Sequence, residues 1–563
     1  MRISTFFIVV FALVAQVAIA AENPLDMIPA SASVIVRLQA PETMIEELGS
    51  FIDKVQPGFG NVAKAQLMPA LGQAISNTSL DGVDITRDWY VAIFIDEDKE
   101  PKSVLLIPTT DVAEVKEAMG SAFEFIEKNG WLVCTNVDQY HDEFKKCLSG
   151  EADSVSKKFD ERTKAALMSG HLCAAVNVGA VRQAFEEELS SAEGRLEDLI
   201  QAMGQQIKAA SPETDMGYVL DMYRDMGKLV LQGAQDSNSA VISIRVTNKA
   251  LQIDQLLTVD ENSKTDRFFR TQPVGDMARL GSIPEGLPGY AAVHADPAIM
   301  LDWSERVMSS MFKDKEQKEK ATQSLAIMRK AKFGTIAGGG DLLPDEDAAL
   351  RYFAMSEISP SSVVLDAFKA MGSGMEYEIA GIVQKQSFEM NAEKIDGQSV
   401  NVFRMQQTMP PSLDPTGMQK AINEKMYGPD GIVQRIVVKD DVALQTMGGG
   451  TDSMKQLMTA KNWSDPLLLE ARARQHEKAN LIMLVDVPNM VQKFATLILG
   501  LGVIPFPIQP EQLDGLEIAP SYSGFSLAVE KQRATARTCV PVETFQGFVQ
   551  IGIFVQQLRG QLQ

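Results

Sequence analysis

Histidine is the first residue type to examine for chemistry, because its imidazole ring serves as a general base and as a zinc ligand near neutral pH. The sequence has four, and none of His141, His171, His294 and His476 lies beside another or within an H-E-x-x-H motif. Without ligands at a recognised spacing, no metal site is predicted. His141 and Cys147 have the residue types of a Cys/His nucleophile pair, but we interpret this segment as the solvated start of a helix.

Motifs for covalent catalysis and for phosphate binding are missing from the sequence. It has no G-x-S-x-G nucleophile elbow and no G-x-x-x-x-G-K-[ST] loop. The glycines of Gly448–Ser453 precede a predicted helix, whose N-terminal N–H groups could hold an anion. We interpret this segment instead as a turn in which Thr451 or Asp452 caps the helix. The sequence therefore predicts no catalytic, cofactor-binding or metal-binding residue, and no cofactor.

Two acidic clusters and a group of methionines are the remaining candidates. Asp96–Glu100 and Asp341–Asp347 have the oxygen ligands that Ca²⁺ prefers, but neither has the glycine and glutamate positions of an EF-hand loop. We interpret both as solvated loops. Met216, Met222 and Met226 lie close together in a predicted helical hairpin. Because methionine packs adaptably, they favour either a groove for a lipid or apolar peptide or ordinary core packing.

Length and charge bound the class of protein. The chain has 563 residues, so two or three domains are expected. It carries 53 Lys and Arg against 74 Asp and Glu, a formal net charge of −21. Such a charge repels nucleic-acid phosphates and anionic lipid headgroups, so nucleic-acid binding is disfavoured. The hydrophobic content of 45% is typical of a globular protein.

The first 20 residues have the pattern of an export signal. Arg2 precedes an apolar run from Thr5 to Val17, and Ala18-Ile19-Ala20 supplies the small residues of a cleavage site. We expect a signal peptide at residues 1–20 that is cleaved near Ala20, and no transmembrane segment after cleavage. The mature protein is then expected in the periplasm or outside the cell.

The cysteines are compatible with this compartment. An oxidising compartment permits disulfides, and Cys134 and Cys147 are close enough in sequence to close a small loop. The alternative is that these two, with Cys173 and Cys539, are small buried hydrophobic residues. No C-x-x-C motif is present, so zinc-binding spacing is absent.

A short strand that leads into a proline and a helix occurs twice. The first copy spans residues 28–55 and the second residues 283–311. Pro29 and Pro284 are separated by 255 positions, and Pro41 and Pro297 by 256. Two predicted hairpins, at residues 240–259 and 523–540, match at a separation of 283. These matches predict an internal duplication, although any strand–turn–helix protein offers some by chance.

The pattern predicts an α+β fold of two tandem related domains, each a mostly antiparallel sheet with helices packed on one face. The domains would span residues 21–275 and 276–563. We expect a helix from Asp111 to about Lys128, a loop at residues 334–344, and a three-strand meander at 376–405 that turns at Lys385-Gln386. The helix at 543–562 is apolar on most sides, so we expect it to be buried, in the second core or in a dimer contact.

The chain resembles uncharacterised bacterial secreted proteins of a domain-of-unknown-function family. The resemblance rests on the exported start and on the motif Ile-Pro, Val-x-Val, Pro-x-x-Met at residues 25–55, with its copy at 281–311. The resemblance implies no catalytic residue. We expect an exported, non-catalytic binding or structural protein of the cell envelope, with an unknown protein or an apolar ligand as its partner. A carrier of lipid or another apolar ligand is one alternative, and an unrecognised hydrolase is another.

Overall fold

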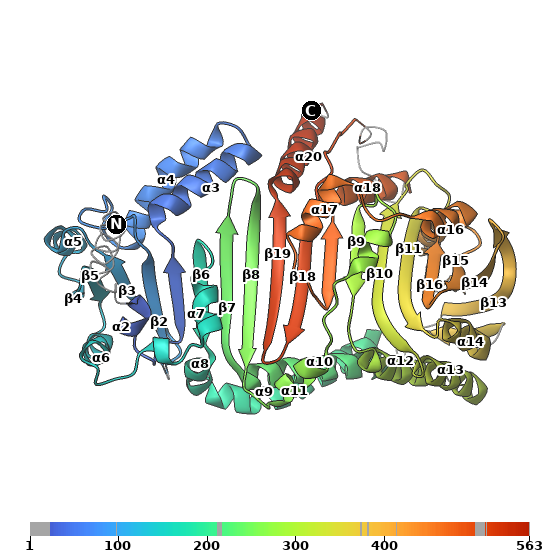
Figure 1. The fold of residues 1–563 in the computed structure, drawn as a ribbon, viewed down its shortest axis with the longest axis horizontal. Helices are drawn as coiled ribbons and strands as arrows, with labels where there is room; N and C mark the ends of the chain where they lie inside the picture. The colour runs from blue at the N-terminus through green and yellow to red at the C-terminus, as the bar shows by residue number, and fades with distance from the viewer. Residues whose placement is uncertain are drawn as a thin grey trace, which may run out of the picture. The chain divides into compact units, whose positions relative to one another are not determined.

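The computed structural model describes residues 23–561, apart from residues 97, 211–216, 313, 372–373, 380–381, 412–413, 502–512 and 514. The expected signal peptide lies outside the described residues. The chain forms two compact units, whose elements are shown in Figure 1. Unit 1 comprises Met1–Gly49, Asn61–Glu186 and Asn238–Arg245, and unit 2 comprises Ser50–Gly60, Glu187–Ser237 and Val246–Gln563. The expected α+β class is confirmed, and the domain boundary at residue 275 stays a prediction.

Unit 1 is built on an antiparallel sheet with the strand order β4-β5-β3-β2-β1-β6-β7. Its strands are β1 (Val34–Leu38), β2 (Trp89–Ile95), β3 (Pro101–Pro108), β4 (Glu124–Lys128), β5 (Trp131–Thr135), β6 (Leu172–Asn177) and β7 (Ser237–Val246). The helices that lie wholly or partly in this unit are α2 (Pro24–Met27), α3 (Pro41–Val55), α4 (Phe59–Ala74), α5 (Val112–Met119), α6 (Asp138–Ser149), α7 (Glu161–Leu167), α8 (Val178–Ala184) and α9 (Glu186–Ala210).

The helix expected from Asp111 to Lys128 is wrong at its C-terminal end. Asp111 is the N-cap, and its carboxylate accepts from the N–H groups of Ala113 and Glu114. Gly120, with φ of 74°, then ends α5, because glycine adopts this conformation without a Cβ clash. Residues 124–128 form strand β4, which pairs with β5.

A buried ion pair joins three segments of unit 1. Arg37 on β1 donates to Asp88 Oδ2 through Nε and Nη2, both at 2.7 Å, and through Nη1 to the Gly170 carbonyl at 2.9 Å. The Ala40 N–H donates to the other oxygen of Asp88. The Arg37 side chain is only 6% exposed, so its charge depends on this partner.

Unit 2 contains a longer antiparallel sheet with the order β8-β19-β18-β17-β9-β10-β11-β16-β15-β14-β13-β12. Its strands are β8 (Ala250–Val259), β9 (Gly289–Val293), β10 (Lys332–Leu342), β11 (Leu350–Ser359), β12 (Met375–Ile379), β13 (Ile382–Ile395), β14 (Gln398–Thr408), β15 (Ile432–Lys439), β16 (Val442–Met447), β17 (Leu481–Val485), β18 (Ser523–Glu530) and β19 (Arg533–Pro541).

The strand orders of the two units match over seven strands. In unit 2 the run β15-β16-β11-β10-β9-β17-β18 follows the same order along the chain and the same antiparallel senses as β4-β5-β3-β2-β1-β6-β7 of unit 1. Strands β1 and β9 are the two copies of the repeated sequence motif. Strands β12 to β14 extend the unit 2 sheet beyond this shared run.

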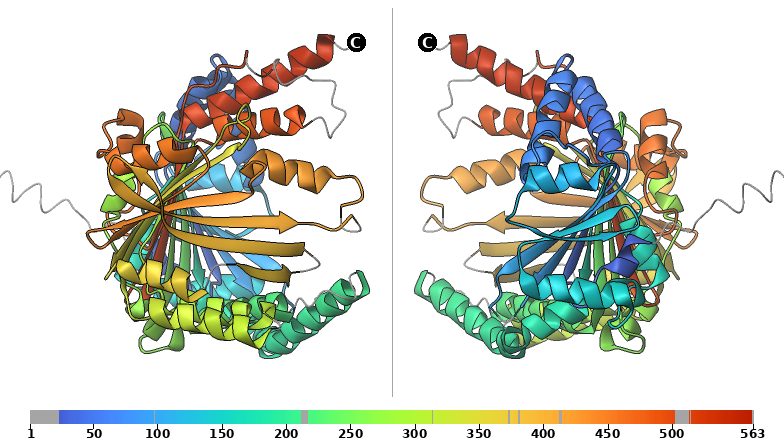
Figure 2. Two further views of the ribbon diagram at one scale, coloured as in Figure 1. Left: turned by 90° about the vertical axis from the view of Figure 1, so that its right-hand side faces the viewer. Right: turned by 90° about the vertical axis from the view of Figure 1, so that its left-hand side faces the viewer.

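The helices of unit 2 lie on both faces of its sheet. They are α10 (Gly217–Asp236), α11 (Lys264–Thr271), α12 (Ala298–Met311), α13 (Lys315–Met328), α14 (Ser362–Met371), α15 (Met418–Tyr427), α16 (Gly450–Thr459), α17 (Pro466–Ala473), α18 (Val487–Gly500) and α20 (Val542–Gln561), with the 3₁₀ turn η2 (Ala278–Ser282). Figure 2, left, shows α18 and α20 along one rim of the sheet and α12 and α13 along the other.

Two expectations for the strands of unit 2 are wrong. Residues 334–344 are not a loop, because residues 332–342 form β10 in the interior of the sheet. The meander does not turn at Lys385-Gln386, since β13 is continuous from Ile382 to Ile395. Its second turn, at Asp396-Gly397, lies where the sequence places it.

The C-terminal helix is not buried on all sides. Phe548, Ile553 and Val555 of α20 are 43%, 49% and 36% exposed. The helix packs through its first turns, where the Phe545 ring lies 5.3 Å from that of Phe51, and Gly547 lies against Pro488 of α18. The expected full burial is therefore wrong, and the dimer contact stays a prediction.

Candidate functional site

One face of the central strands of unit 2 is packed and the other is largely uncovered. On the packed face, Tyr290, Phe353 and Ile482 are buried against η2, α17 and the neighbouring loops. The opposite face is formed by alternate residues of β17, β9, β10 and β11, and we call this set the open face. It comprises Leu481, Met483, Val485, Gly289, Ala291, Val293, Ile336, Gly338, Gly340, Tyr352 and Ala354.

Three large side chains of the open face are exposed although they lie on interior strands. Ile336 on β10 is 39% exposed, and Tyr352 on β11 and Met483 on β17 are each 40% exposed. An antiparallel sheet commonly leaves one face in solvent, but the side chains of such a face are then polar. The open face instead exposes large apolar side chains, which a further layer would bury.

The strand register determines where large and small side chains lie on the open face. Met483 pairs with Ala291, Ala291 with Gly338, and Gly338 with Ala354, so a row of small residues crosses the sheet beside the methionine. The Tyr352 ring extends over this row, because a Cβ on Gly338 would lie 2.9 Å from the tyrosine hydroxyl. Burial against the sheet raises the pKa of Tyr352, so its hydroxyl is neutral at pH 7.

Helices of the same unit cover the flanking parts of this sheet face. Around Ile358, Ile436 and Ala443, α13 and α14 pack on β10, β11, β15 and β16. Phe269 of α11 packs on Val529 at the other flank. The two covered flanks show that this face accepts helices as its second layer.

A polar cavity of about 690 Å³ lies on another part of unit 2 and contains one of the four histidines. His294 Nδ1 lies 3.1 Å from Thr335 Oγ1, and the Thr335 N–H donates to Glu357 Oε2 at 2.9 Å. Arg279 Nε donates to Glu357 Oε1 at 2.6 Å. Thr335 is only 3% exposed, and both oxygens of Glu357 are engaged elsewhere. The groups therefore lack the carboxylate behind the histidine that a nucleophile–base set uses.

A second hydroxyl–histidine pair is buried in the sheet. Ser526 Oγ lies 2.8 Å from His476 Nδ1 and 3.0 Å from Gln475 Oε1. Burial lowers the pKa of His476, which would suit a general base. However, Ser526 is 0% exposed, so a substrate has no access to its hydroxyl. The arrangement packs β18 against the loop after α17.

The remaining histidines and the cysteines are dispersed. His141 and His171 face single carboxylates, those of Glu124 at 3.4 Å and Glu47 at 3.3 Å. All four cysteines are free and buried, so Cys134 and Cys147 form no disulfide in this structure. Burial raises the pKa of the Cys134 thiol to about 12 and thereby removes its nucleophilic thiolate.

The acidic clusters and the methionine group do not converge on a site. Asp341 is not in a solvated loop, because it is 8% exposed on β10 and pairs with Lys493 of α18. Of the three methionines, Met216 lies outside the described residues, and Met226 is 56% exposed on α10. No group of three His, Cys, Asp or Glu side chains is placed to hold a metal ion within the described part of the chain.

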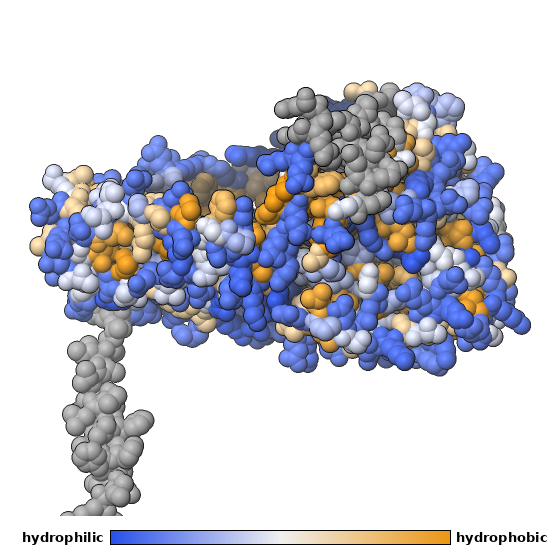
Figure 3. Space-filling view, turned by 90° about the horizontal axis from the view of Figure 1, so that it is seen from above, coloured by the Kyte–Doolittle hydropathy of each residue, from blue (hydrophilic) through white to orange (hydrophobic). Residues whose placement is uncertain are grey.

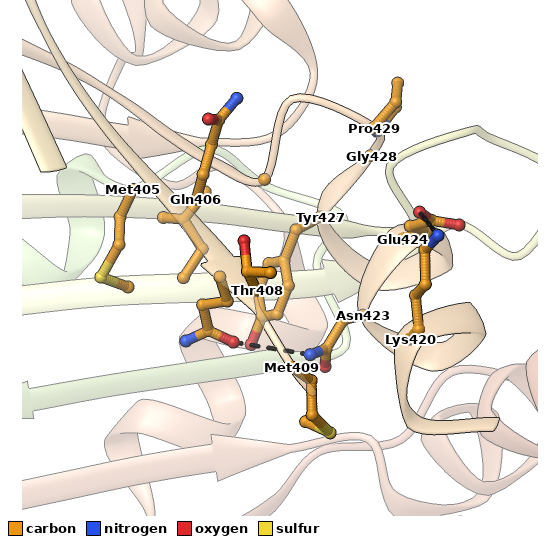
Figure 4. Close-up of a pocket in the computed structure, with 13 residues that line it drawn as sticks. Met405, Gln406, Thr408, Met409, Lys420, Asn423, Glu424, Tyr427, Gly428 and Pro429 are labelled. Carbon is orange, nitrogen blue, oxygen red and sulfur yellow. Dashed lines mark hydrogen bonds and ion pairs between the residues drawn. The ribbon is translucent and has the colours of Figure 1, made fainter. Parts of the chain in front are cut away.

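A smaller cavity, of about 340 Å³, lies between the end of β14 and α15 (Figure 4). Its walls combine thioethers, amides and a phenol, including those of Met405, Met409, Gln407, Asn423 and Tyr427. The lining residues include no histidine, cysteine or serine. The cavity therefore offers hydrogen bonds and apolar contact, and its charged lining residues are Lys420 and Glu424.

Other exposed apolar side chains lie on strands as well as helices, since Leu172 on β6, Ile242 on β7 and Met390 on β13 are 40%, 40% and 41% exposed. Val491 and Phe494 on α18 are 43% and 56% exposed, and Phe548 on α20 is 43% exposed. Seen from above, hydrophilic residues predominate and apolar residues gather in separate patches (Figure 3). The open face differs from the helix patches because its exposed residues lie on paired strands, where three large side chains share one face of β17, β10 and β11. No helix of the described residues is long and apolar enough to cross a membrane.

Sequence reasoning missed the open face because it missed two of the four strands that form it, β10 and β11. Residues 334–344, with three consecutive glycines, predict a loop, and the strand β11 is not anticipated. A signal was present in the alternation Ile336, Gly338, Gly340, in which small residues mark close approach of a neighbouring ring.

Comparisons with known proteins add little at this point. No family model matches the chain, and no curated protein matches it. One solved structure, titled crystal form IV of TP0453, is similar with a TM-score of 0.23 and 8% sequence identity, over 48% of this chain and 96% of that chain. A likeness at this level carries no argument about fold or function.

Proposed function

We propose that this protein is an exported, non-catalytic binding protein of the bacterial cell envelope, and that the open face of unit 2 binds an amphipathic helix of a protein partner. The observation that carries the proposal is the exposure of Ile336, Tyr352 and Met483 on interior strands. Fully burying a side chain of this size stabilises a complex by about 1.5–3 kcal/mol, so three together provide a substantial driving force.

The backbone of the open face excludes a strand as the occupant. Strands β17, β9, β10 and β11 are hydrogen-bonded to neighbours on both sides, so they have no free edge to extend. An occupant must contribute apolar side chains instead. A helix does so on the flanking parts of the same sheet face, where α11, α13 and α14 pack. The net charge of −21 favours a basic polar side on the partner helix.

The chemistry of the hydroxyl–histidine pairs supports a non-catalytic role. Thr335 and Ser526 are 3% and 0% exposed, so neither hydroxyl meets a substrate. The open face also differs from the pocket of a lipid carrier, which encloses most of its ligand.

Native mass spectrometry of protein purified from its own envelope tests this function. We expect a protein partner at fixed stoichiometry with the unaltered protein, and its loss in Met483→Glu. Leu467→Glu is the matched control, because Leu467 is 44% exposed on α17. Co-purification of lipid in place of a protein, or equal binding by Met483→Glu, would contradict the proposal.

We also propose that the two units arose by duplication, which the matching strand orders support. Asp254 and Arg537 are counterparts at the separation of 283, and within unit 2 they face each other across β8 and β19 and form an ion pair at 2.6 Å. A crystal structure in which only β1 and β9 superpose would contradict the duplication.

A further inference from the structure

The N-terminus of α16 lacks the side-chain cap that the sequence predicts. Neither Thr451 nor Asp452 is the N-cap, which is Gly449, and no side chain caps the helix there. Gly448, Gly449 and Gly450 have φ of 74°, 62° and 60°. A helix start leaves N–H groups without intrahelical partners, and these groups with the helix dipole favour an anion.

Three polar atoms around this helix start are buried without a hydrogen-bond partner among the described residues. They are Thr446 Oγ1, Ser453 Oγ and Arg351 Nε. Thr446 is 1% exposed and Ser453 is 2% exposed. An unsatisfied buried group costs about 1–3 kcal/mol, so three in one place require an explanation in the function of the protein.

Two of the three atoms lie against the same residue, and the third lies on the same side of the sheet. A Cβ on Gly449 would lie 2.0 Å from Ser453 Oγ and 2.9 Å from Arg351 Nε, so both atoms lie against the N-cap residue. Ser453 is in the first turns of α16, where side chains lean toward the helix N-terminus. Thr446 is the register partner of Phe353, and Arg351 is two residues before Phe353 on the same strand. Both side chains therefore lie on the same side of the sheet as Phe353.

We propose that the N-terminus of α16 is a binding site for a phosphate-type oxyanion, held by first-turn N–H groups, the Ser453 hydroxyl and Arg351. A tetrahedral oxyanion accepts several hydrogen bonds at once and matches a guanidinium. A Cβ on Gly450 would meet no atom within 4 Å apart from its chain neighbours and the backbone of α16, so there is open space beside the first turn. Binding requires Ser453 to rotate to a staggered well in which its hydroxyl faces this space.

The charges nearby set the strength of the site. Arg351 Nη2 pairs with Glu346 Oε1 at 3.0 Å, and the Glu346 side chain is 47% exposed. An exposed pair of this kind is worth at most about 1 kcal/mol, so an incoming oxyanion displaces the glutamate readily. Asp452 in the first turn opposes the anion. We therefore expect millimolar to micromolar binding, strengthened at low ionic strength.

The test uses the full mature chain with two probes, inorganic phosphate and vesicles of phosphatidylglycerol, measured by calorimetry and by thermal unfolding. We expect binding of one probe, weakened at least about tenfold in Ser453→Ala and in Arg351→Met. Without the probe, Ser453→Ala and Thr446→Val unfold at the same or a higher temperature, because each removes an unsatisfied hydroxyl. Thr459→Ala, at the other end of α16, is the matched control.

The two probes separate the sources of the anion. Binding of phosphate alone identifies a soluble oxyanion, and binding of vesicles alone identifies a lipid headgroup. No binding of either probe would overturn the proposal. Equal weakening by Thr459→Ala and Ser453→Ala would also overturn it, because the effect would then arise from the helix and not from its N-terminus.

Discussion

Removing Asp88 should destabilise unit 1 far more than removing an exposed carboxylate. The Arg37 side chain is 6% exposed and directs two donors at Asp88 Oδ2, each at 2.7 Å. Without Asp88 this guanidinium stays buried with the carbonyls of Gly170 and Leu167 and the Tyr90 hydroxyl, which are all uncharged. Breaking a buried pair costs about 3–5 kcal/mol. The lost hydrogen bond from the Ala40 N–H adds about 1 kcal/mol.

Removing Arg37 in place of Asp88 should cost less stability. Arg37→Met leaves Asp88, whose side chain is 28% exposed and can be solvated, so we expect a loss of about 1–3 kcal/mol. The double variant Arg37→Met, Asp88→Ala should be more stable than Asp88→Ala alone, because it removes the unpaired buried charge. A sum of the two single losses in the double variant would contradict this reasoning.

Hydrogen exchange read by mass spectrometry measures the effect where it occurs. Amides of β1, β2 and β6 should lose protection in Asp88→Ala, while those of β14 and β15 in unit 2 keep theirs. Asp98→Ala is the control, since the exposed pair of Asp98 with Lys102 should contribute no measurable stability. A loss below about 1 kcal/mol in Asp88→Ala would refute the assignment of Arg37 as a buried charge that depends on its partner.

Two further predictions concern acid stability and the glycine turn. Hydrogen bonding from Arg270, with added N–H donors from Asn262 and Gln532, lowers the pKa of Asp266 to about 2. This contribution to stability is complete above about pH 4 and is lost as the pH falls toward about 2. Urea unfolding across this range should therefore show a weaker acid dependence in Asp266→Asn than in the unaltered protein, and equal slopes would contradict it. Gly448→Ala should destabilise more than Gly450→Ala, which is expected to cost about 1–2 kcal/mol for a left-handed alanine. Both have positive φ, but a Cβ on Gly448 would lie 2.0 Å from the Leu350 carbonyl oxygen. Equal unfolding midpoints of the two variants would contradict this prediction, because they would show that the Leu350 carbonyl moves aside at little cost.

The sequence predicts elements well where the local pattern is sufficient. The helix at Pro41–Val55 has the expected bounds, because its proline and its apolar spacing act within the segment. Strands β18 and β19 likewise lie at the expected hairpin. Helix α5 is shorter than expected because the apolar residues beyond Gly120 fit a strand as well as a helix, and only pairing with β5 decides between them.

The open face could not be predicted from the sequence of any single segment. Gly338, Gly339 and Gly340 predict a loop locally, yet a Cβ on Gly339 would lie 2.7 Å from Leu287, so packing requires glycine in this strand. The partners of Arg37 are similarly distant, since Asp88 and Gly170 are brought to it by β2 and the loop before β6. Which strand face remains uncovered follows from helix placement, which spacing does not determine.

The binding of a helical partner on the open face is tested most directly by photocrosslinking in the native envelope. A photoreactive residue at position 336 or 483 should form an adduct with one protein, through a peptide of amphipathic helical pattern. The same residue at position 467 should form none. Adducts with lipid, or equal yields at all three positions, would contradict a helix-binding open face.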